Sequence, residues 1–189
     1  MPRFVRRLAL LAFLAWACPP IVPPVRAGEP PAVGARAGLD LATDAARIWA
    51  PDARLVYLEN DEDLTGQGTA ARWGYLYYSP ERDAARGYTV RQGRIAEAAD
   101  LGFAFPAPPL PETWIDSGAA VAAAEQEHGR RFRQEQGGRL GSALLIRGAL
   151  HDQRPDAATW AVVYVSDTGA PLTVVVDAAT GKVVRTWRG

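Results

Sequence analysis

Few side chains in this 189-residue chain have the types and spacings that catalyse reactions or bind metals. The two histidines, His128 and His151, stand alone, without the HExxH spacing or the cysteine cluster that would complete a zinc site. Ser79 and Ser166 lie outside any nucleophile elbow, and we expect both to cap turns at the ends of strands. The sequence therefore predicts no catalytic, metal-binding or cofactor-binding residues.

Two further segments contain residues that bind ligands in other contexts. Residues 59–63 (Glu-Asn-Asp-Glu-Asp) offer oxygen ligands for calcium. They lack the EF-hand spacing and its glycine at the sixth position, which favours a solvated loop. Residues 137–141 are glycine-rich but lack the lysine and the following helix of a phosphate-binding loop, which favours a turn into a strand.

An aromatic motif occurs twice in the chain. The segment 73–79 returns as 160–166, with Trp, Tyr and Ser at the same spacing and an offset of 87 residues. In both copies a Thr-Val pair follows, and then a glycine with a basic and an aliphatic residue after it. Self-similarity of this kind indicates two copies of one small structural module.

The aromatic residues of the first copy lie on both faces of the strand that they predict. Trp73, Tyr75 and Tyr77 share one face, because alternate side chains of a strand point to the same side, and Leu76 and Tyr78 share the other. One face must pack under a helix. The second face either packs against the other module or binds a partner, which makes Trp73, Tyr75 and Tyr77 the candidate partner-binding residues.

The elements around the first copy form a module that spans residues 39–102. Leu41, Ala45, Ile48 and Trp49 recur at helical spacing and predict an amphipathic helix that ends before Pro51. Strands are expected at residues 54–58, 72–79, 87–91 and, more weakly, 94–96. A proline-rich linker at residues 103–113 follows this module.

The second module spans residues 114–189. Asp116 or Ser117 is the expected N-cap of an alanine-rich helix that Gly129 should end. Strands are expected at residues 140–147, 160–166, 172–176 and 182–187. The predicted fold class is α+β, with two tandem modules in which a helix packs on one face of an antiparallel sheet.

Residues 1–27 have the layout of a secretory signal peptide, with arginines before an apolar run and a cleavage site at Ala27. Cys18, the only cysteine, lies in this segment, and its acylation is the less favoured interpretation. Residues 28–38 show no periodicity and are expected to form a flexible leader. The expected location is therefore periplasmic or secreted.

Cleavage after Ala27 would change both the charge and the chemistry of the chain. Lys and Arg balance Asp and Glu at 21 each, and four arginines would leave with the leader. The acidic remainder is a poor partner for nucleic acid, and the apolar run of the leader is too short for a stable membrane span. A single lysine beside twenty arginines indicates a GC-rich bacterial genome.

The end of the second module resembles a PepSY domain. Residues 172–183 form a predicted strand and an Asp-Ala-Ala-Thr-Gly-Lys-Val turn, similar to the closing hairpin of that family, and an aromatic strand precedes them as it does there. The resemblance covers residues 114–189 and implies that Asp177, Thr180 and Gly181 form a structural turn. The first module lacks the Asp and Thr of the turn, so it is expected to be a degenerate copy. Its assignment to the same family depends on the internal repeat.

PepSY domains occur in exported bacterial envelope proteins and in the propeptides of thermolysin-like proteases. The resemblance implies a non-catalytic module that binds or inhibits another envelope protein or peptide, with peptidases among the candidate partners. Two alternatives stay open. One is a small envelope hydrolase with an unrecognised carboxylate site, and the other is a structural, lipoprotein-like envelope component.

Overall fold

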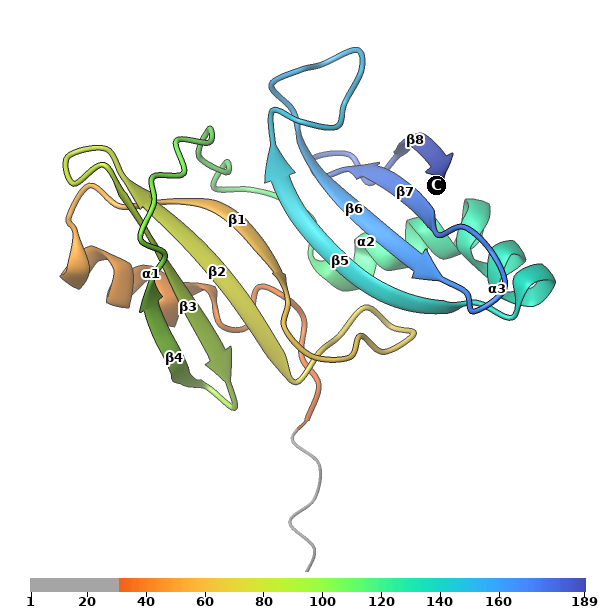
Figure 1. Cartoon of the computed structure of the whole chain (residues 1–189), viewed down its shortest axis with the longest axis horizontal. Helices are drawn as coiled ribbons and strands as arrows, with labels where there is room; N and C mark the ends of the chain where they lie inside the picture. The colour runs from red at the N-terminus through yellow and green to blue at the C-terminus, as the bar shows by residue number, and fades with distance from the viewer. Residues whose placement is uncertain (1–30) are drawn as a thin grey trace, which may run out of the picture.

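One antiparallel sheet of eight strands runs through the part of the chain that this computed structural model describes, residues 31–189 (Figure 1). The strand order is β4-β3-β2-β1-β5-β6-β7-β8. In each half the chain proceeds outward from the centre, so that β1 and β5 meet in the middle and β4 and β8 form the two edges. The predicted signal peptide and Cys18 lie outside the described residues.

Each half contains helical structure followed by four strands, which confirms the predicted α+β class with helices packed on one sheet face. The first half comprises α1 (Leu39–Trp49), β1 (Arg54–Asn60), β2 (Arg72–Ser79), β3 (Ala84–Arg91) and β4 (Arg94–Asp100). The second half comprises α2 (Ser117–Ala124), the π-helical turn η1 (Glu125–Gly129), α3 (Arg130–Gln136), β5 (Arg139–Arg147), β6 (Ala158–Val165), β7 (Leu172–Asp177) and β8 (Val183–Arg188). Residues 101–116, without helix or strand, connect the halves.

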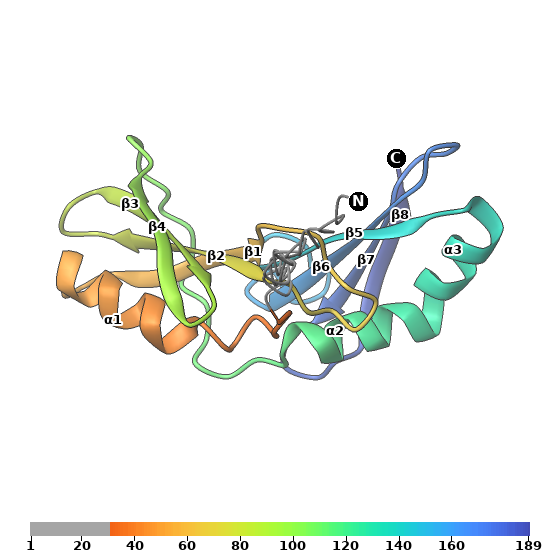
Figure 2. The same ribbon diagram turned by 90° about the horizontal axis from the view of Figure 1, so that it is seen from below.

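The helices of both halves lie on the same side of the sheet. Figure 2 shows α1 under the first half and α2 and α3 under the second, while no helix of the described residues covers the opposite face. Burial along β2 follows this arrangement, because every second residue faces the helices and is buried. The opposite face of β2 is half-buried.

The two halves meet along a short pairing of their central strands. Tyr57, Leu58 and Glu59 of β1 lie opposite residues 146, 145 and 144 of β5, in that order. Leu58 and Leu145 are fully buried at this seam. The buried residues of both halves form one continuous cluster, so the two predicted modules share a core.

The helix α1 lies where the sequence places it but buries a different face. The periodicity placed Leu41 and Ile48 toward the core, and this orientation is wrong. The structure buries Ala42 and Ala46, whereas Ile48 is 88% exposed. The sheet beneath α1 supplies large aromatic rings, so the helix packs closely only through small side chains.

The helix of the second half continues past the glycine that was expected to end it. Gly129 keeps right-handed helical backbone at φ −65°, within the continuous run of α2, η1 and α3. A Cβ at this position would overlap the ring of Tyr164, so the glycine serves close packing. The helix ends instead at Gly137, whose φ of +59° suits a residue without a side chain.

Residues 33–38, expected to belong to a flexible leader, are fixed by contacts with the second half. The backbone N–H of Ala35 donates to Ser117 Oγ at 3.1 Å, and the backbone N–H of Arg36 donates to Asp116 Oδ1 at 3.1 Å. The Arg36 guanidinium donates to the carbonyl of Trp114 at 2.8 Å and lies over its ring. This segment therefore connects the two halves beside the start of α2.

Candidate binding surfaces

The three β2 aromatic residues considered for partner binding lie in the core. Trp73, Tyr75 and Tyr77 are each 1% exposed, on the face that α1 covers. The indole N–H of Trp73 donates to the carbonyl of Val33 at 2.9 Å, and the Tyr75 hydroxyl donates to the carbonyl of Ala35 at 2.7 Å. These rings hold the segment before α1 against the sheet, and Trp73 and Tyr75 also line a hollow of about 400 Å³ beside that segment.

The two tryptophans of the repeated motif occupy equivalent places. Trp73 lies on β2 and Trp160 on β6, each the second strand of its half. The Trp160 indole donates to the carbonyl of Ile115 at 2.8 Å, so each indole binds the segment before the helix of its own half. The two rings meet edge to face with centroids 6.4 Å apart, and Trp114 packs on Trp160 at 5.8 Å. Trp73 and Trp160, the tryptophans of the repeated motif, thus lie in contact in the core.

The tyrosines of the motif are buried phenols. The hydroxyls of Tyr77 and Thr43 are hydrogen-bonded at 2.7 Å, whereas the Tyr164 hydroxyl has no hydrogen-bond partner among the described residues. Burial raises the pKa of Tyr77 to about 12 and also raises the pKa of Tyr164. Both side chains therefore stay neutral at physiological pH and contribute to packing.

The serines of the motif stabilise turns. Ser79 donates from Oγ to the carboxylate of Asp52 at 2.6 Å and accepts the backbone N–H of Arg82 at 3.1 Å. The hydrogen bond from Ser79 lowers the pKa of the Asp52 carboxyl. Ser166 donates to the carbonyl of Gln136 at 2.6 Å. Ser79 thus ties the end of β2 to the chain after α1, and Ser166 ties the chain after β6 to the last residue of α3.

The acidic segment after β1 has structural partners. Asn60 accepts the backbone N–H of Ala143 through its side-chain oxygen at 2.7 Å, which adds a bond between the halves. Asp61 pairs with Arg72 at 2.8 Å. Among residues 31–189, no group of three His, Cys, Asp or Glu side chains is placed to hold a metal ion. In the same range, no helix has the length and apolar character needed to cross a bilayer.

Asp177 organises the turn between β7 and β8. Its Oδ1 accepts the backbone N–H of Thr180 at 2.8 Å and the Thr180 hydroxyl at 2.9 Å. Gly181 follows with φ at +72°, a conformation that glycine adopts without steric cost. Asp177, Thr180 and Gly181 therefore take up the geometry of a tight hairpin turn.

A buried cluster that the sequence analysis did not anticipate lies over this turn. His151, only 8% exposed, places Nε2 3.7 Å from Asp177 Oδ2, and Arg154 forms an ion pair with the same oxygen. The Nδ1 atom of His151 accepts the backbone N–H of Arg154 at 3.1 Å, and its Nε2 atom accepts the side-chain Nε–H of the same arginine at 3.4 Å. Thr180, the nearby hydroxyl, bonds Asp177 and not the imidazole. The cluster therefore anchors the β5–β6 loop rather than forming a nucleophile with its base.

A hollow of about 520 Å³ lies between this loop and the start of β8. Arg154 and Lys182 bring positive charge to its lining, and Val183 and Val184 bring β8 into it. Arg154 is 54% exposed at its side chain despite the ion pair with Asp177. The lining also contains one carboxylate, Asp152, which pairs with Arg185 at 2.9 Å.

A shallower hollow of about 200 Å³ lies on the first half of the sheet. Gly74 and Gly87 lie in its lining and have no side chains to fill it, and Tyr57 and Leu76 lie beside them. This hollow is smaller and contains fewer charged groups than the one beside β8. The sheet thus offers an apolar depression in one half and a charged one near the edge of the other.

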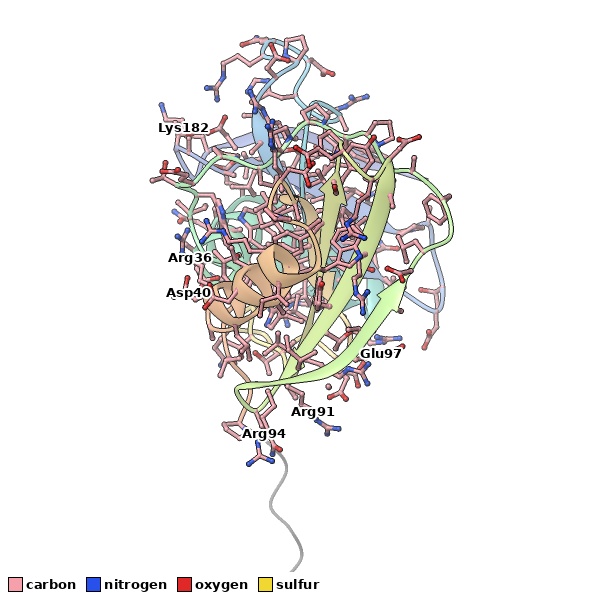
Figure 3. The ribbon with its side chains drawn as sticks, turned by 90° about the vertical axis from the view of Figure 1, so that its left-hand side faces the viewer. Arg36, Asp40, Arg91, Arg94, Glu97 and Lys182 are labelled. Atoms are coloured by element: carbon pink, nitrogen blue, oxygen red, sulfur yellow. The ribbon has the colours of Figure 1, made fainter. Side chains whose placement is uncertain are left out.

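The two edges of the sheet differ in charge. On β4, Glu97 and Asp100 lie 3.4 and 3.3 Å from the guanidinium groups of Arg72 and Arg86. Figure 3 looks onto this edge, where Arg94 and Glu97 point away from the ribbon. The sequence of β8 contains two arginines and no acidic residue.

No family model and no curated protein matches this chain. A protein of Clostridium difficile 630 described as a "putative lipoprotein" is similar in structure, with a TM-score of 0.57 and 12% identity over 80% of this chain and 93% of that one. The YpeB C-terminal domain of Bacillus megaterium has a TM-score of 0.27 and 10% identity, over 82% of this chain and 65% of that one. The first similarity supports a shared helix-on-sheet fold, and the second is too weak to support an argument.

Proposed function

We propose that this chain is an exported, non-catalytic binding protein of the bacterial cell envelope that docks on another envelope protein or peptide. The observation that carries the proposal is the pair of free edges of the sheet. No helix of the described residues covers the face opposite the helices, and the edge strands β4 and β8 each pair with a strand on one side only. Edge strands bind extended segments through backbone hydrogen bonds, the mode of recognition that such a sheet offers most directly.

The proposed architecture is two PepSY-like modules fused through their central strands. Three features support it: the equivalent positions of Trp73 and Trp160, the hairpin turn at Asp177, and the mirrored order of the strands about the seam. We interpret the repeat as one ancestral helix-plus-sheet unit that was copied once. The signal-peptide pattern of residues 1–27 supports export.

The non-catalytic part of the proposal rests on how the reactive side chains are used. His151 is held at Nδ1 by backbone N–H groups and faces a carboxylate already paired with arginine. Ser79 and Ser166 are bound in turns, and the buried tyrosines are neutral. These side chains therefore use their polar atoms in contacts that stabilise the fold, and we infer that they do not act on a substrate.

Site-directed cross-linking tests the proposal, because Cys18 is the only cysteine and lies in the predicted signal peptide. Single cysteines would replace Ala98 on β4, Thr186 on β8 and Gly74 on the uncovered face, with Ile48→Cys on the exposed side of α1 as the matched control. The chain would be produced in its own bacterium and treated with a cell-permeant maleimide cross-linker.

We expect one protein adduct that forms from at least one sheet position and not from Ile48→Cys. Mass spectrometry of the adduct identifies the partner and shows whether it is a peptidase. Equal adducts from all four positions, or none from the three sheet positions, would overturn the proposal.

A further inference from the structure

Along the edge strand β8, residues whose backbone groups face β7 alternate with residues whose backbone groups face outward. The backbone N–H of Gly189 donates to the carbonyl of Pro171 at 3.2 Å, toward β7. In an antiparallel ladder, alternate residues bond to the same side, so Trp187 also faces β7. Thr186 and Arg188 therefore turn their N–H and C=O groups outward, where a further strand would bond.

Positive charge lies along this edge and in the adjoining 520 Å³ hollow, from Arg154, Lys182, Arg185 and Arg188. Two of these cations are already compensated, since Arg154 pairs with Asp177, and Arg185 with Asp152 at 2.9 Å. Within residues 31–189, no ion pair joins Lys182 or Arg188 to a carboxylate, and the Arg188 guanidinium lies over the Phe132 ring, 5.2 Å from its centroid. These two cations are separated by six residues, about 20 Å along an extended chain.

The opposite edge has no excess of positive charge. Arg94 is the one cation of β4, and the strand also carries the carboxylates Glu97 and Asp100, which lie near arginines of β2 and β3. The chain after residue 27 is itself acidic, so excess positive charge at one edge is a local property. This difference in charge favours β8 as the binding edge and an acidic segment as its partner.

We propose that β8 takes up an extended, acidic segment of a partner protein as a ninth strand. Backbone groups of Thr186 and Arg188 bind the main chain of the segment, while its carboxylates meet Lys182 at the hollow and Arg188 at the far end of the strand. This inference rests on the proposed function and adds to it the site and the chemistry of the partner.

Binding of synthetic peptides to the purified chain tests the inference. The probe is a fluorescein-labelled peptide with alternating Glu and Val residues, and its matched controls carry Lys in place of Glu or N-methylated alternate amides. Fluorescence anisotropy should show saturable binding of the Glu peptide, weakened by salt, and at least about tenfold weaker binding of both controls.

Variants of the edge locate the binding site. The double variant Lys182→Glu, Arg188→Glu should weaken binding of the Glu peptide by about tenfold or more, whereas Arg94→Glu on the β4 edge should leave it unchanged. Thr186→Pro removes an outward N–H, so it should weaken binding while Thr186→Ala does not. Far-UV circular dichroism of each variant verifies that the sheet remains folded.

Equal binding of the Glu and Lys peptides, or unchanged binding by the double variant, would overturn the inference. Association of the chain with itself in sedimentation, lost in the double variant, would also overturn it by making a second copy the occupant of β8. A protein adduct from Ala98→Cys or Gly74→Cys, without peptide binding at β8, would leave the proposed function standing and remove only this inference.

Discussion

The two halves of the sheet pack equivalent strands under helices in different ways. In the first half, the hydroxyl of Tyr77 finds a hydrogen-bond partner in Thr43 of α1. In the second half, Tyr164 presses against Gly129, and its hydroxyl is buried without a partner among the described residues. The aromatic strands therefore hold equivalent places in the two halves, whereas the helices that pack on them differ.

The π-helical turn η1 is the clearest difference between the helices of the two halves. It lies between α2 and α3 and ends at Gly129, where the ring of Tyr164 approaches the helix backbone. In a π turn the backbone hydrogen bonds run from residue i to i+5, which widens one turn of the helix. The helix of the first half is shorter, and hydrogen bonds from the sheet, not a widened turn, fix its position.

The largest predicted effect concerns the tryptophans that join the halves. Trp160→Ala should lower the free energy of unfolding by about 3–5 kcal/mol, because it removes a buried ring. Trp73→Ala should lower the free energy of unfolding by less, because Trp160 packs on two rings, Trp73 and Trp114. The double variant should fall short of the sum by about 0.5–1.5 kcal/mol, the coupling of an aromatic pair. Urea unfolding followed by circular dichroism measures these values, and strict additivity would contradict contact between the halves.

Alkaline pH should destabilise the fold through its buried phenols. Burial raises the pKa of Tyr77 to about 12, and it also raises the pKa of Tyr75 in the same half. The neutral form is favoured in the folded state, so the stabilisation is complete below about pH 10 and is lost as pH rises toward 12. For Tyr77 alone the loss is about 3 kcal/mol. Urea unfolding at stepwise pH should show this fall, and Tyr77→Phe should reduce it; a constant unfolding free energy up to about pH 11.5 would contradict it.

Substitution of Gly129 tests the close packing of the second half. Gly129→Ala should destabilise the protein by about 1–3 kcal/mol, because the added Cβ overlaps the buried Tyr164 ring. Helix propensity alone predicts the opposite, a gain of about 1 kcal/mol. Gly66→Ala, in the β1–β2 loop with open space around it, is the matched control and should be close to neutral. Thermal unfolding distinguishes the two effects, and a more stable Gly129→Ala variant would show that the ring moves freely.

The smallest predicted effect distinguishes the two equivalent tyrosines. Tyr77→Phe leaves the Thr43 hydroxyl without its partner and should cost about 1 kcal/mol. Tyr164→Phe removes a buried hydroxyl that has no partner among residues 31–189, so it should be neutral or slightly stabilising. Urea unfolding of the two single variants measures the difference, and an equal cost for both would contradict the contrast between the halves.

The sequence predicted those features that local patterns determine. The aromatic and apolar runs located the strands β2 and β6, and the Asp-to-Gly spacing located the turn after β7. The repeated motif indicated two modules of like construction, and the structure places Trp73 and Trp160 on equivalent strands. These features need only a few neighbouring residues to specify them.

Features that depend on distant partners were missed. Hydropathy alone placed Ile48 toward the core, yet the rings of the sheet select the small residues Ala42 and Ala46 instead. His151 lies in the β5–β6 loop and Asp177 at the end of β7, with no motif that joins them, so no local signal pointed to their contact. The bonds of residues 33–38 are made largely by backbone atoms, which leave no pattern in the sequence.

The seam between β1 and β5 has a consequence for how the chain folds. All other neighbouring strands are consecutive in the chain, so each half can form its meander through local contacts. The seam alone requires Tyr57 to meet Ile146 across the intervening chain, and the entropy of closing that loop slows such non-local pairing. The halves would then assemble separately and join late, and hydrogen exchange should find the seam amides less protected than those between β2 and β3 or between β6 and β7.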